Sequence, residues 1–458
     1  MKTKPRHIAV IDIGKTNAKL ALVDRAAMRE LAVLTRPNRV LPGPPYPHFD
    51  TDGHWRFILA GLAQLHTSHG VDGIAMTAHG ACAALLGADG HLAAPVLDYE
   101  HDGPEDTAAG YDALRPAFAQ TGSPRLAKGL NLGAQLHWLL ARDAGLRARV
   151  RHVVTWPQCW GYLLTGKFAC DVSSLGCHTD LWDPQTGQFS TVVDRLGLRG
   201  IMAQPMRPDA VLGAVLPAIA KATGLAHDTP VVCGIHDSNA SLLPHLLTQT
   251  GPFAVVSTGT WVVCMAVGGN APIMDATRDV LVNVAADGRA VPSARFMGGR
   301  EYEMVCAGRA LVATPADETA VLAAGLMLWP SIVADGGPFA GCRMGWSAPP
   351  YGYGDGACEV ALAFYLALMT TECLVLTGAI GPVIVEGPFA ANPAYCRMLA
   401  AATGRPVLRA ASKTGTSIGA ALLFGAPETP PPMVATVAAA NVSDYRTYAL
   451  AWRAAING

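Results

Sequence analysis

The chain has 458 residues, which is too long for one ordinary hydrophobic core and suits two large domains or three modest ones. Hydrophobic residues make up 51% and charged residues 15%, a composition that excludes global disorder. The net charge of -1 excludes the electrostatic footprint of a nucleic-acid or anionic-membrane surface. We therefore expect a small-molecule partner, with no nucleic acid and no membrane.

The eleven cysteines are dispersed, without a Cys-x-x-Cys pair or a zinc-spaced Cys/His cluster, so we expect reduced core thiols. The first residues run into a strand-like segment without an apolar signal region, which favours a cytoplasmic protein. Long apolar stretches such as 211–226 are broken by Pro, Gly or Lys before the ~20 residues that a membrane span needs. The low charge share favours a buried subunit interface, and we expect a homodimer.

Short β-rich runs alternate with longer Ala/Leu-rich runs, as at 8–14, 57–66 and 73–80, which predicts an α/β fold. The first two runs of strand type, 8–13 and 18–23, flank a polar turn and predict a β-hairpin. Four residues of this turn are candidates for phosphate binding: Gly14, Lys15, Thr16 and Asn17.

Asp12 interrupts the first apolar strand of this hairpin. A buried carboxylate costs several kcal/mol unless it is paired, hydrated or bound to a metal. One interpretation, which needs support from a second copy of the motif, is a phosphate loop in which Asp12 reaches Mg²⁺ directly or through water. The alternative is an ordinary hairpin turn that Asp12 caps.

The segment 253–261 repeats the pattern of 8–16 without gaps, with Gly259 at the place of Gly14. This repeat predicts two homologous halves. The second turn carries hydroxyls and no charge, which suits a polyphosphate because a second carboxylate would repel it. Its candidates for phosphate binding are Thr258, Gly259 and Thr260.

Asp237 lies between the halves, where a strand at 231–233, a turn at Gly234 and a helix from Ser238 are predicted. The end of a strand is a favoured place for functional residues in open α/β sheets. Asp237 can there accept a proton from an alcohol that attacks a γ-phosphate. The alternative is that Asp237 or Ser238 only caps the helix.

Two strand-to-helix units follow near the C-terminus. Residues 382–404 predict a strand, a Gly/Pro turn and a helix that is capped by Asn392 and ends at Gly404. Residues 406–425 repeat this order, and their small residues favour tight helix packing over contact with a flat ligand.

Four motifs in register resemble the FGGY carbohydrate kinases of the actin/hexokinase ATPase superfamily. They are Asp12-Ile-Gly-Lys-Thr-Asn, Gly161-Tyr-Leu-Leu-Thr-Gly-Lys with Asp180-Leu-Trp-Asp-Pro, Gly234-Ile-His-Asp237, and Ser257-Thr-Gly-Thr-Trp. The resemblance implies an α/β fold of two ribonuclease-H-like domains, 1–245 and 246–458, flanking a catalytic cleft that closes over sugar and ATP. It also explains the internal repeat.

The resemblance further implies residue roles, with Asp237 as the general base and Asp12 as the residue that holds Mg²⁺. The segment after Pro95 should supply an acceptor for a sugar hydroxyl, and the register leaves Asp98, Glu100 and Asp102 open, of which we favour Asp102. The sugar-binding set is His79, Gly80, Asp102, His236 and Asp237. The adenosine-binding set is Glu386, Gly387, Pro388 and Asn392, followed by the segment Ser417-Ile-Gly-Ala-Ala.

Trp261 after the Gly-Thr pair and the segment GGREYEMV from Gly298 are similar to rhamnulokinases and fuculokinases. This similarity implies ATP-dependent phosphorylation of the C1 hydroxyl of a 6-deoxyketohexose such as L-rhamnulose or L-fuculose. Xylulose, ribulose, glycerol or another polyol stays open as the substrate, as do a non-catalytic sugar sensor and an ATPase of the actin or chaperone type.

The sequence departs from the family pattern at three places. Lys15 stands where a small hydroxyl residue is common, and Gln158 replaces an acidic residue before the middle helix. Glu386-Gly-Pro replaces a run of glycines, which affects the adenine pocket.

Overall fold

The computed structural model describes residues 5–334, 336–410, 415–430, 432–436 and 441–457. The chain divides into two compact units. Unit 1 comprises Met1–Thr248, Val282–Ala290 and Thr414–Pro430, and unit 2 comprises Gln249–Leu281, Val291–Lys413 and Pro431–Gly458. These two units are groups of residues that pack together. The predicted boundary at residue 245 separates two homologous halves of the sequence, and it stays a prediction.

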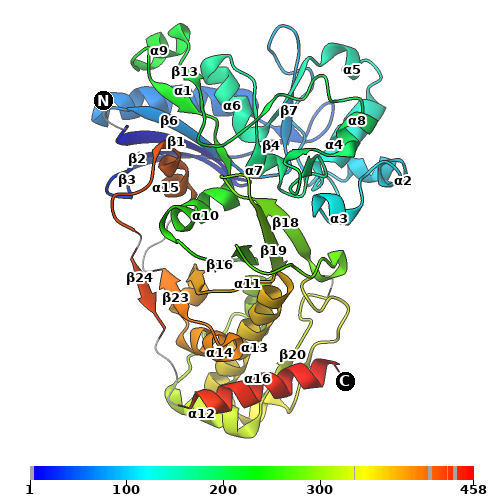
Figure 1. Cartoon of the computed structure of the whole chain (residues 1–458), viewed down its shortest axis with the longest axis vertical. Coiled ribbons are helices and arrows are strands. Elements are labelled where there is room, and N and C mark those ends of the chain that lie inside the picture. Colours follow the sequence, from blue (N-terminus) through cyan, green and yellow to red (C-terminus); the bar gives the residue numbers. More distant parts are fainter. Residues whose placement is uncertain (1–4, 335, 411–414, 431, 437–440, 458) are drawn as a thin grey trace. The chain divides into compact units, whose positions relative to one another are not determined.

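Unit 1 is built on a seven-stranded sheet (Figure 1). Its strand order is β13 (Val211–Ala214), β14 (Pro230–Val232), β6 (Gly73–Ala78), β1 (His7–Ile13), β2 (Asn17–Asp24) and β3 (Arg29–Pro37), with β15 (Ile235–His236) also paired to β6. The β1–β2 pair is antiparallel, which confirms the first predicted hairpin.

The second sheet also has seven strands. Its order is β18 (Val280–Val284), β19 (Ala290–Phe296), β17 (Val262–Val267), β16 (Phe253–Thr258), β22 (Val383–Glu386), β23 (Val407–Ala410) and β24 (Met433–Ala435). The β16–β17 pair is antiparallel, which confirms the second predicted hairpin.

The internal repeat extends to the topology of both sheets. The order β3-β2-β1-β6-β14-β13 corresponds strand for strand to β19-β17-β16-β22-β23-β24. In both of these strand orders, the five successive pairs of neighbouring strands are antiparallel, antiparallel, parallel, parallel and antiparallel. This agreement supports two related halves, as the sequence repeat predicts.

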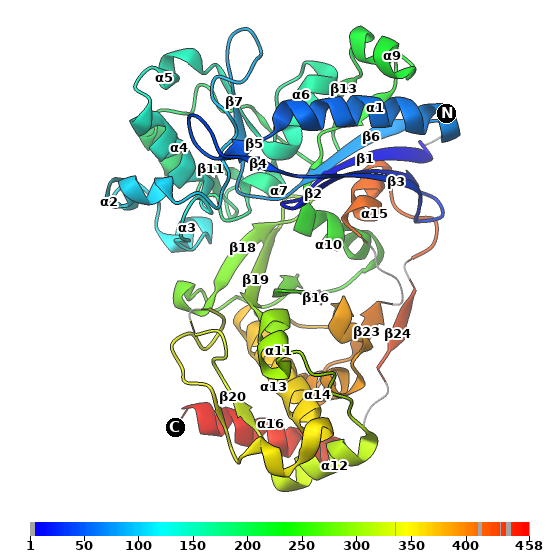
Figure 2. The ribbon, with the colours of Figure 1, turned by 180° about the vertical axis from the view of Figure 1, so that it is seen from behind.

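Helices cover both faces of the sheet in unit 1, with α1 (Thr51–His69) on one face and α10 (Asp237–Thr248) and α15 (Thr416–Ala421) on the other (Figure 2). Side chains alternate along a strand, so Ile11 packs in the core with α1, whereas Val10 packs in the core that includes α15. Asp12, two residues after Val10, therefore points to the face that α15 covers.

The small residues of α15 serve tight packing, as predicted. A Cβ at Gly419 would lie 1.8 Å from the carbonyl oxygen of Ala240 in α10, so only glycine permits this helix contact.

Unit 1 also contains short strands and helices outside its sheet. They are β4 (Val40–Leu41), β5 (His48–Phe49), β7 (Ala83–Leu86), α2 (Ala108–Asp112), α3 (Phe118–Thr121), α4 (Leu132–Arg142), α5 (Leu146–Arg149), β8 (His152–Thr155), α6 (Trp156–Thr165), β9 (Cys170–Asp171), α7 (Val172–Leu175), β10 (Trp182–Asp183), β11 (Gln188–Phe189), α8 (Thr191–Arg195), β12 (Pro205–Met206) and α9 (Pro217–Thr223).

Unit 2 has its core around the helix α13 (Gly354–Leu376). The other elements outside the sheet are α11 (Gly298–Cys306), α12 (Pro315–Ala324), β20 (Leu328–Trp329), β21 (Gly345–Trp346), α14 (Pro393–Thr403) and α16 (Val442–Asn457). The predicted Asn392 cap of α14 and its end at Gly404 are confirmed, because Asn392 accepts a hydrogen bond from the backbone of Tyr395.

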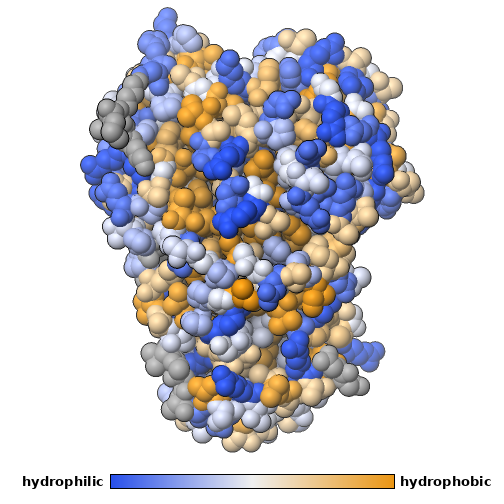
Figure 3. Space-filling view, in the orientation of Figure 1, coloured by the Kyte–Doolittle hydropathy of each residue, from blue (hydrophilic) through white to orange (hydrophobic). Residues whose placement is uncertain are grey.

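Helix α13 is 23 residues long and apolar enough to cross a membrane by length and composition, but 89% of its apolar window is buried in the structure. It is thus a core helix, and it corrects the expectation that every long apolar stretch is interrupted early. The eleven cysteines, all of them within the described residues, form no disulfide; ten are buried and Cys342 is exposed. Hydrophobic residues reach the visible surface of each unit in several places (Figure 3).

Candidate active site

Asp237 lies at the junction of β15 and α10, as predicted. The preceding turn needs Gly234, whose φ is +94° and where a Cβ would lie 2.8 Å from the carbonyl oxygen of Met76. The buried side chain of Gln158 donates to the carbonyl oxygen of Cys233 at 2.8 Å. Gln158 therefore supports the segment that leads to Asp237.

His236 orients the carboxylate of Asp237. Its Nε2 lies 3.2 Å from Asp237 Oδ1, and its Nδ1 lies 3.4 Å from the Nδ2 of Asn239. Because the amide nitrogen can only donate, Nδ1 is the acceptor and Nε2 carries the proton that faces Asp237. Burial lowers the pKa of His236 to about 4, so the imidazole is neutral at neutral pH.

The carboxylate of Asp237 is 31% exposed and therefore remains accessible. Its Oδ1 accepts a hydrogen bond from the backbone nitrogen of Ser238 at 2.6 Å. Burial raises the pKa of Asp237, while the hydrogen bonds from Ser238 oppose this shift. A raised pKa makes a carboxylate a better proton acceptor.

His79 and Gly80 follow β6, with His79 near the carboxylate of Asp237 and Gly80 beside the ring of His236. His79 Nδ1 donates to the carbonyl oxygen of Gly80 at 2.9 Å, and its buried Nε2 has no hydrogen-bond partner within the described residues. A Cβ at Gly80 would lie 3.0 Å from Nε2 of His236. The structure thus brings four predicted sugar-site residues together: His79, Gly80, His236 and Asp237.

Aromatic rings surround the imidazole of His79. The ring centroids of Phe49 and Tyr99 both lie 5.2 Å from that of His79, and the centroid of Trp156 lies 6.4 Å away. Burial lowers the pKa of His79, so its ring stays neutral and its Nε2 is an acceptor. The sequence analysis missed these three aromatic residues because they come from distant segments.

Lys15 contacts carboxylates in the structure, and its role in phosphate binding stays a prediction. Its ammonium forms ion pairs with Asp98 and, at 3.1 Å, with Glu100. It also lies over the ring of Tyr99 at 4.6 Å. Lys15 therefore joins the hairpin turn to the segment after Pro95.

The same ion pair distinguishes the acidic residues of that segment. Asp98 is buried beside Lys15, whereas the Asp102 side chain is 83% exposed and lies 3.5 Å from the ring of His101. Of the two, Asp98 is the buried carboxylate, and a contact of this segment with sugar stays a prediction.

Thr16 and Asn17 are exposed at the first hairpin turn, and the backbone nitrogen of Gly14 donates to the carbonyl oxygen of Asn17 at 2.9 Å. A buried network behind the turn escaped the sequence analysis. Asn38 donates through its side chain to the carbonyl oxygen of Gly14 at 2.8 Å and through its backbone to that of Thr16 at 2.9 Å.

His54 in α1 completes this network. Arg36 donates to His54 Nδ1 at 3.0 Å, so Nε2 carries the proton and donates to Asn38 Oδ1 at 2.7 Å. Burial lowers the pKa of His54 to about 4, which keeps it neutral. The network therefore fixes the two carbonyl groups of the turn and leaves its outer side open.

Asp12 is held from α15. Its Oδ2 accepts hydrogen bonds from the hydroxyls of Thr416 at 2.6 Å and Ser417 at 3.3 Å, and Lys19 Nζ lies 3.9 Å away. Burial and the charge of Asp237 raise the pKa of Asp12, and these partners oppose the shift. The Ser417 segment packs in unit 1, and the adenosine role implied for it stays a prediction.

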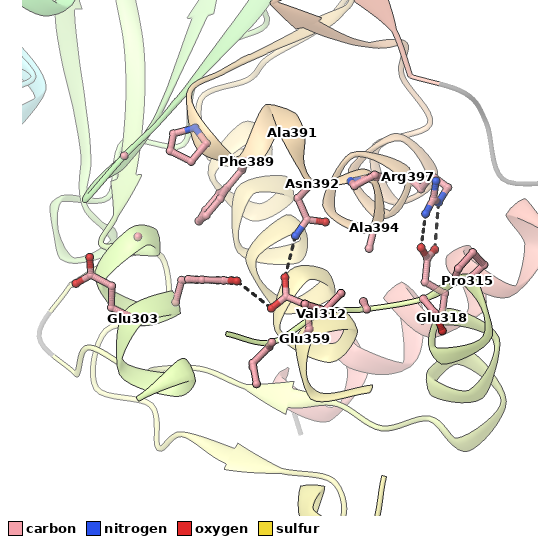
Figure 4. Close-up of a pocket in the computed structure, with 18 of the residues that line it drawn as sticks. Glu303, Val312, Pro315, Glu318, Glu359, Phe389, Ala391, Asn392, Ala394 and Arg397 are labelled. Atoms are coloured by element: carbon pink, nitrogen blue, oxygen red, sulfur yellow. Dashed lines mark hydrogen bonds and ion pairs between the residues drawn. The ribbon is translucent and has the colours of Figure 1, made fainter. Parts of the chain in front are cut away.

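Unit 2 contains a cavity of about 850 Å³ (Figure 4). Four of the predicted residues line it: Gly259, Thr260, Pro388 and Asn392. The other three residues predicted to bind phosphate or adenosine in this unit, Thr258, Glu386 and Gly387, do not line the cavity. The Thr258 hydroxyl donates to the carbonyl oxygen of Glu386 at 2.5 Å and thereby joins the second hairpin turn to the segment that lines the cavity.

Glu359 and Tyr302 also line the cavity, and the sequence analysis missed both as site residues. The Tyr302 hydroxyl donates to Glu359 Oε2 at 3.0 Å, and Asn392 Nδ2 donates to Glu359 Oε1 at 3.1 Å (Figure 4). A carboxylate inside the apolar run of α13 is the signal that could have identified Glu359. Its burial raises its pKa.

Residues 7–244 match the N-terminal domain of the FGGY family of carbohydrate kinases, and residues 250–432 match the carbohydrate kinase FGGY C-terminal domain. The chain is 25% identical to an L-fuculokinase of Salmonella typhi over 277 residues, 57% of each chain. It is 26% identical to a probable L-xylulose kinase of Pasteurella multocida over 281 residues, 56% of this chain and 55% of that protein. The chain thus spans little more than half the length of these relatives.

A carbohydrate kinase from Novosphingobium aromaticivorans has the same fold with a TM-score of 0.92, 36% identity and 99% coverage of both chains. A xyloylose kinase from Brucella ovis aligns with a TM-score of 0.79 and 20% identity over 99% of this chain and 98% of its own. These neighbours confirm the predicted fold class, in which two α/β halves of the actin/hexokinase type occur in one chain. The chain belongs to the FGGY family of carbohydrate kinases.

Proposed function

We propose that the protein transfers the γ-phosphoryl group of ATP to a primary hydroxyl of a ketose, with Asp237 as the general base. The observation that carries this proposal is the accessible Asp237 carboxylate, which a neutral His236 orients at 3.2 Å. Asp237 accepts the proton of the sugar hydroxyl while that oxygen attacks phosphorus. The proton thus moves from the alcohol to Asp237, and ADP leaves.

The sugar binds in unit 1 beside Asp237. The buried Nε2 of His79, which has no partner among the described residues, supports this assignment because an unpaired buried acceptor costs free energy unless a ligand fills it. Asp98, paired with Lys15, is the second acceptor for a sugar hydroxyl. The rings of Phe49, Tyr99 and Trp156 provide the apolar wall.

For the substrate we favour a 6-deoxyketohexose such as L-fuculose or L-rhamnulose, with L-xylulose as the second candidate. The similarity to proteins named L-fuculokinase and probable L-xylulose kinase supports a ketose. A sugar with an apolar end also suits the aromatic residues around His79.

The residues of the first hairpin fit a magnesium nucleotide. The described residues contain no group of three or more His, Cys, Asp or Glu side chains that could hold a metal, so Asp12 would hold Mg²⁺ together with water and phosphate oxygens. Mg²⁺ is commonly bound through one or two carboxylates plus substrate phosphates. The ion would neutralise charge on the phosphates, and Thr16 and Asn17 would donate to them. Gly14, whose N–H is bonded to the carbonyl oxygen of Asn17, would let the phosphates approach the turn.

The second hairpin turn and the cavity of unit 2 would bind the rest of ATP. Thr260 would supply a neutral donor for phosphate, and Thr258 and Gly259 would shape its turn through their own hydrogen bonds. Pro388 and Asn392 line the nucleoside cavity. Glu386 and Gly387 support this segment through Thr258.

A homodimer and a cytoplasmic location stay predictions.

The proposal is tested by measuring ADP release from MgATP with a panel of ketoses, alditols and aldoses. We expect ADP release that depends on a ketose, with a 6-deoxyketohexose as the best substrate. Release without any sugar would identify an ATPase, and absence of release with every sugar would identify a sensor. Either result would overturn the proposal.

A further inference from the structure

We infer that Glu359 selects the base of the nucleotide by accepting a hydrogen bond from the exocyclic amino group of adenine. This inference rests on the proposed function, because it takes the cavity of unit 2 as the nucleoside site. It adds a specificity-determining residue that the motifs of the sequence do not indicate.

The orientation of the Glu359 carboxylate is fixed from two sides. Oε1 accepts from Asn392 Nδ2 at 3.1 Å, and Oε2 accepts from the Tyr302 hydroxyl at 3.0 Å (Figure 4). Each carboxylate oxygen has a second lone pair, so both oxygens retain capacity for another donor. Only 7% of the residue surface is exposed, and that surface belongs to the wall of the cavity.

Asn392 places a donor next to this acceptor. Its Oδ1 accepts from the backbone nitrogen of Tyr395 at 3.1 Å as the cap of α14, which fixes the amide with Nδ2 toward Glu359. Nδ2 carries two hydrogens, and Glu359 uses one of them. The cavity wall therefore presents a carboxylate acceptor and an amide donor side by side.

This arrangement complements adenine. The adenine edge places the N6 amino donor beside the N7 acceptor, whereas guanine places two acceptors, O6 and N7, at the same positions. The O6 of guanine and the carboxylate of Glu359 are both hydrogen-bond acceptors, so they would repel each other. A site built to pair with an N–H group discriminates strongly against an analogue that lacks it.

The other carboxylates of the cavity are unsuited to this role. Glu318 forms a two-nitrogen ion pair with Arg397 and also accepts from Tyr445. The Glu303 side chain is 69% exposed. Tyr302 and Phe389, with ring centroids 6.2 Å apart, place apolar surface near Glu359, which suits a flat base.

The test uses the full chain and measures equilibrium binding by calorimetry for ATP, GTP and purine riboside triphosphate, which lacks the amino group. We expect the wild type to bind ATP roughly 10- to 100-fold more tightly than either analogue, the range for one well-formed polar pair. Equal affinities for ATP and purine riboside triphosphate would overturn the inference without any variant.

The matching variant is Glu359→Gln, which keeps the shape of the side chain and replaces one acceptor oxygen with a donor. We expect the ATP-to-GTP affinity ratio to fall by roughly tenfold, because the amide can donate to O6 of guanine. Asp355→Asn removes one charge from the same helix at an exposed position, and its ratio should equal that of the wild type. An unchanged ratio in Glu359→Gln would overturn the inference.

Failure of the inference is distinguishable from failure of the proposed function. Calorimetry reports base selection whether or not a sugar is phosphorylated. Sugar-dependent ADP release with an unchanged base preference in Glu359→Gln would refute the role of Glu359 alone.

Discussion

The hydroxyl of Thr416 donates to the carboxylate of Asp12 at 2.6 Å, although 404 positions separate the two residues in the chain. Asp12 is the second-last residue of β1, and Thr416 is the first residue of α15. The contact stabilises the ionised form of a carboxylate whose pKa is raised by burial. It therefore links the end of the chain to the proposed magnesium site.

Replacing Thr416 with valine should weaken magnesium binding. Loss of the hydroxyl raises the pKa of Asp12 further, so the acidic limb of the pH–activity profile should move to higher pH. A hydrogen bond to a charged group contributes about 1.5 to 3 kcal/mol, so the Mg²⁺ concentration for half-maximal rate should rise roughly tenfold or more. Thr416→Ser keeps the donor and is the control. A profile and Mg²⁺ dependence identical to the wild type would refute this role.

Lys15 should act on the sugar and not on the nucleotide. Lys15→Thr removes the cation that holds Asp98, so we expect the KM for the sugar to rise roughly tenfold while the KM for ATP changes by less than about twofold. Lys15→Arg retains the charge, so its KM for the sugar should lie between those of the wild type and Lys15→Thr. The opposite split, with only the KM for ATP raised, would contradict this role and support the phosphate role that the sequence predicted.

Asp98 and Asp102 provide a matched pair for the same site. Asp98→Asn should raise the KM for the sugar because the buried carboxylate is lost, whereas the exposed Asp102 should tolerate Asn. Steady-state kinetics with the best sugar of the panel measures both. A larger effect at Asp102 would reverse the assignment.

The buried imidazole of His54 should make stability depend on pH. Its pKa is lowered from about 6.5 to about 4 in the folded state, so between these values the unfolded state binds a proton that the folded state does not. The free energy of unfolding should therefore fall as pH falls from 6.5 to 4.

Urea unfolding at pH 7 and pH 5 measures this dependence. His54→Gln keeps a donor toward Asn38 and cannot titrate in this range, so its loss of stability between the two pH values should be smaller than that of the wild type. Equal losses in both proteins would show that His54 does not contribute.

Local sequence patterns predicted the two hairpins, the junction at Asp237 and the Asn392 cap, because short-range hydrogen bonds and strand alternation determine these features. The choice between Asp98 and Asp102 depends on where the Lys15 side chain ends, which no local pattern specifies. The same holds for the contact between Asp12 and the distant helix α15.

The nucleoside cavity was predicted only in part for a similar reason. Pro388 and Asn392 belong to a recognisable turn, whereas Glu359 lies in a helix whose burial is set by packing in unit 2. The His54 network also stayed hidden, because Arg36, Asn38 and His54 meet only when β3 packs near α1.

The most direct test of the proposed function is the turnover of Asp237→Asn with MgATP and the best ketose. We predict that the variant binds ATP and sugar like the wild type but loses roughly 10²- to 10⁴-fold in ketose-dependent ADP release, the usual contribution of a general base. Near-normal turnover in Asp237→Asn would contradict the account.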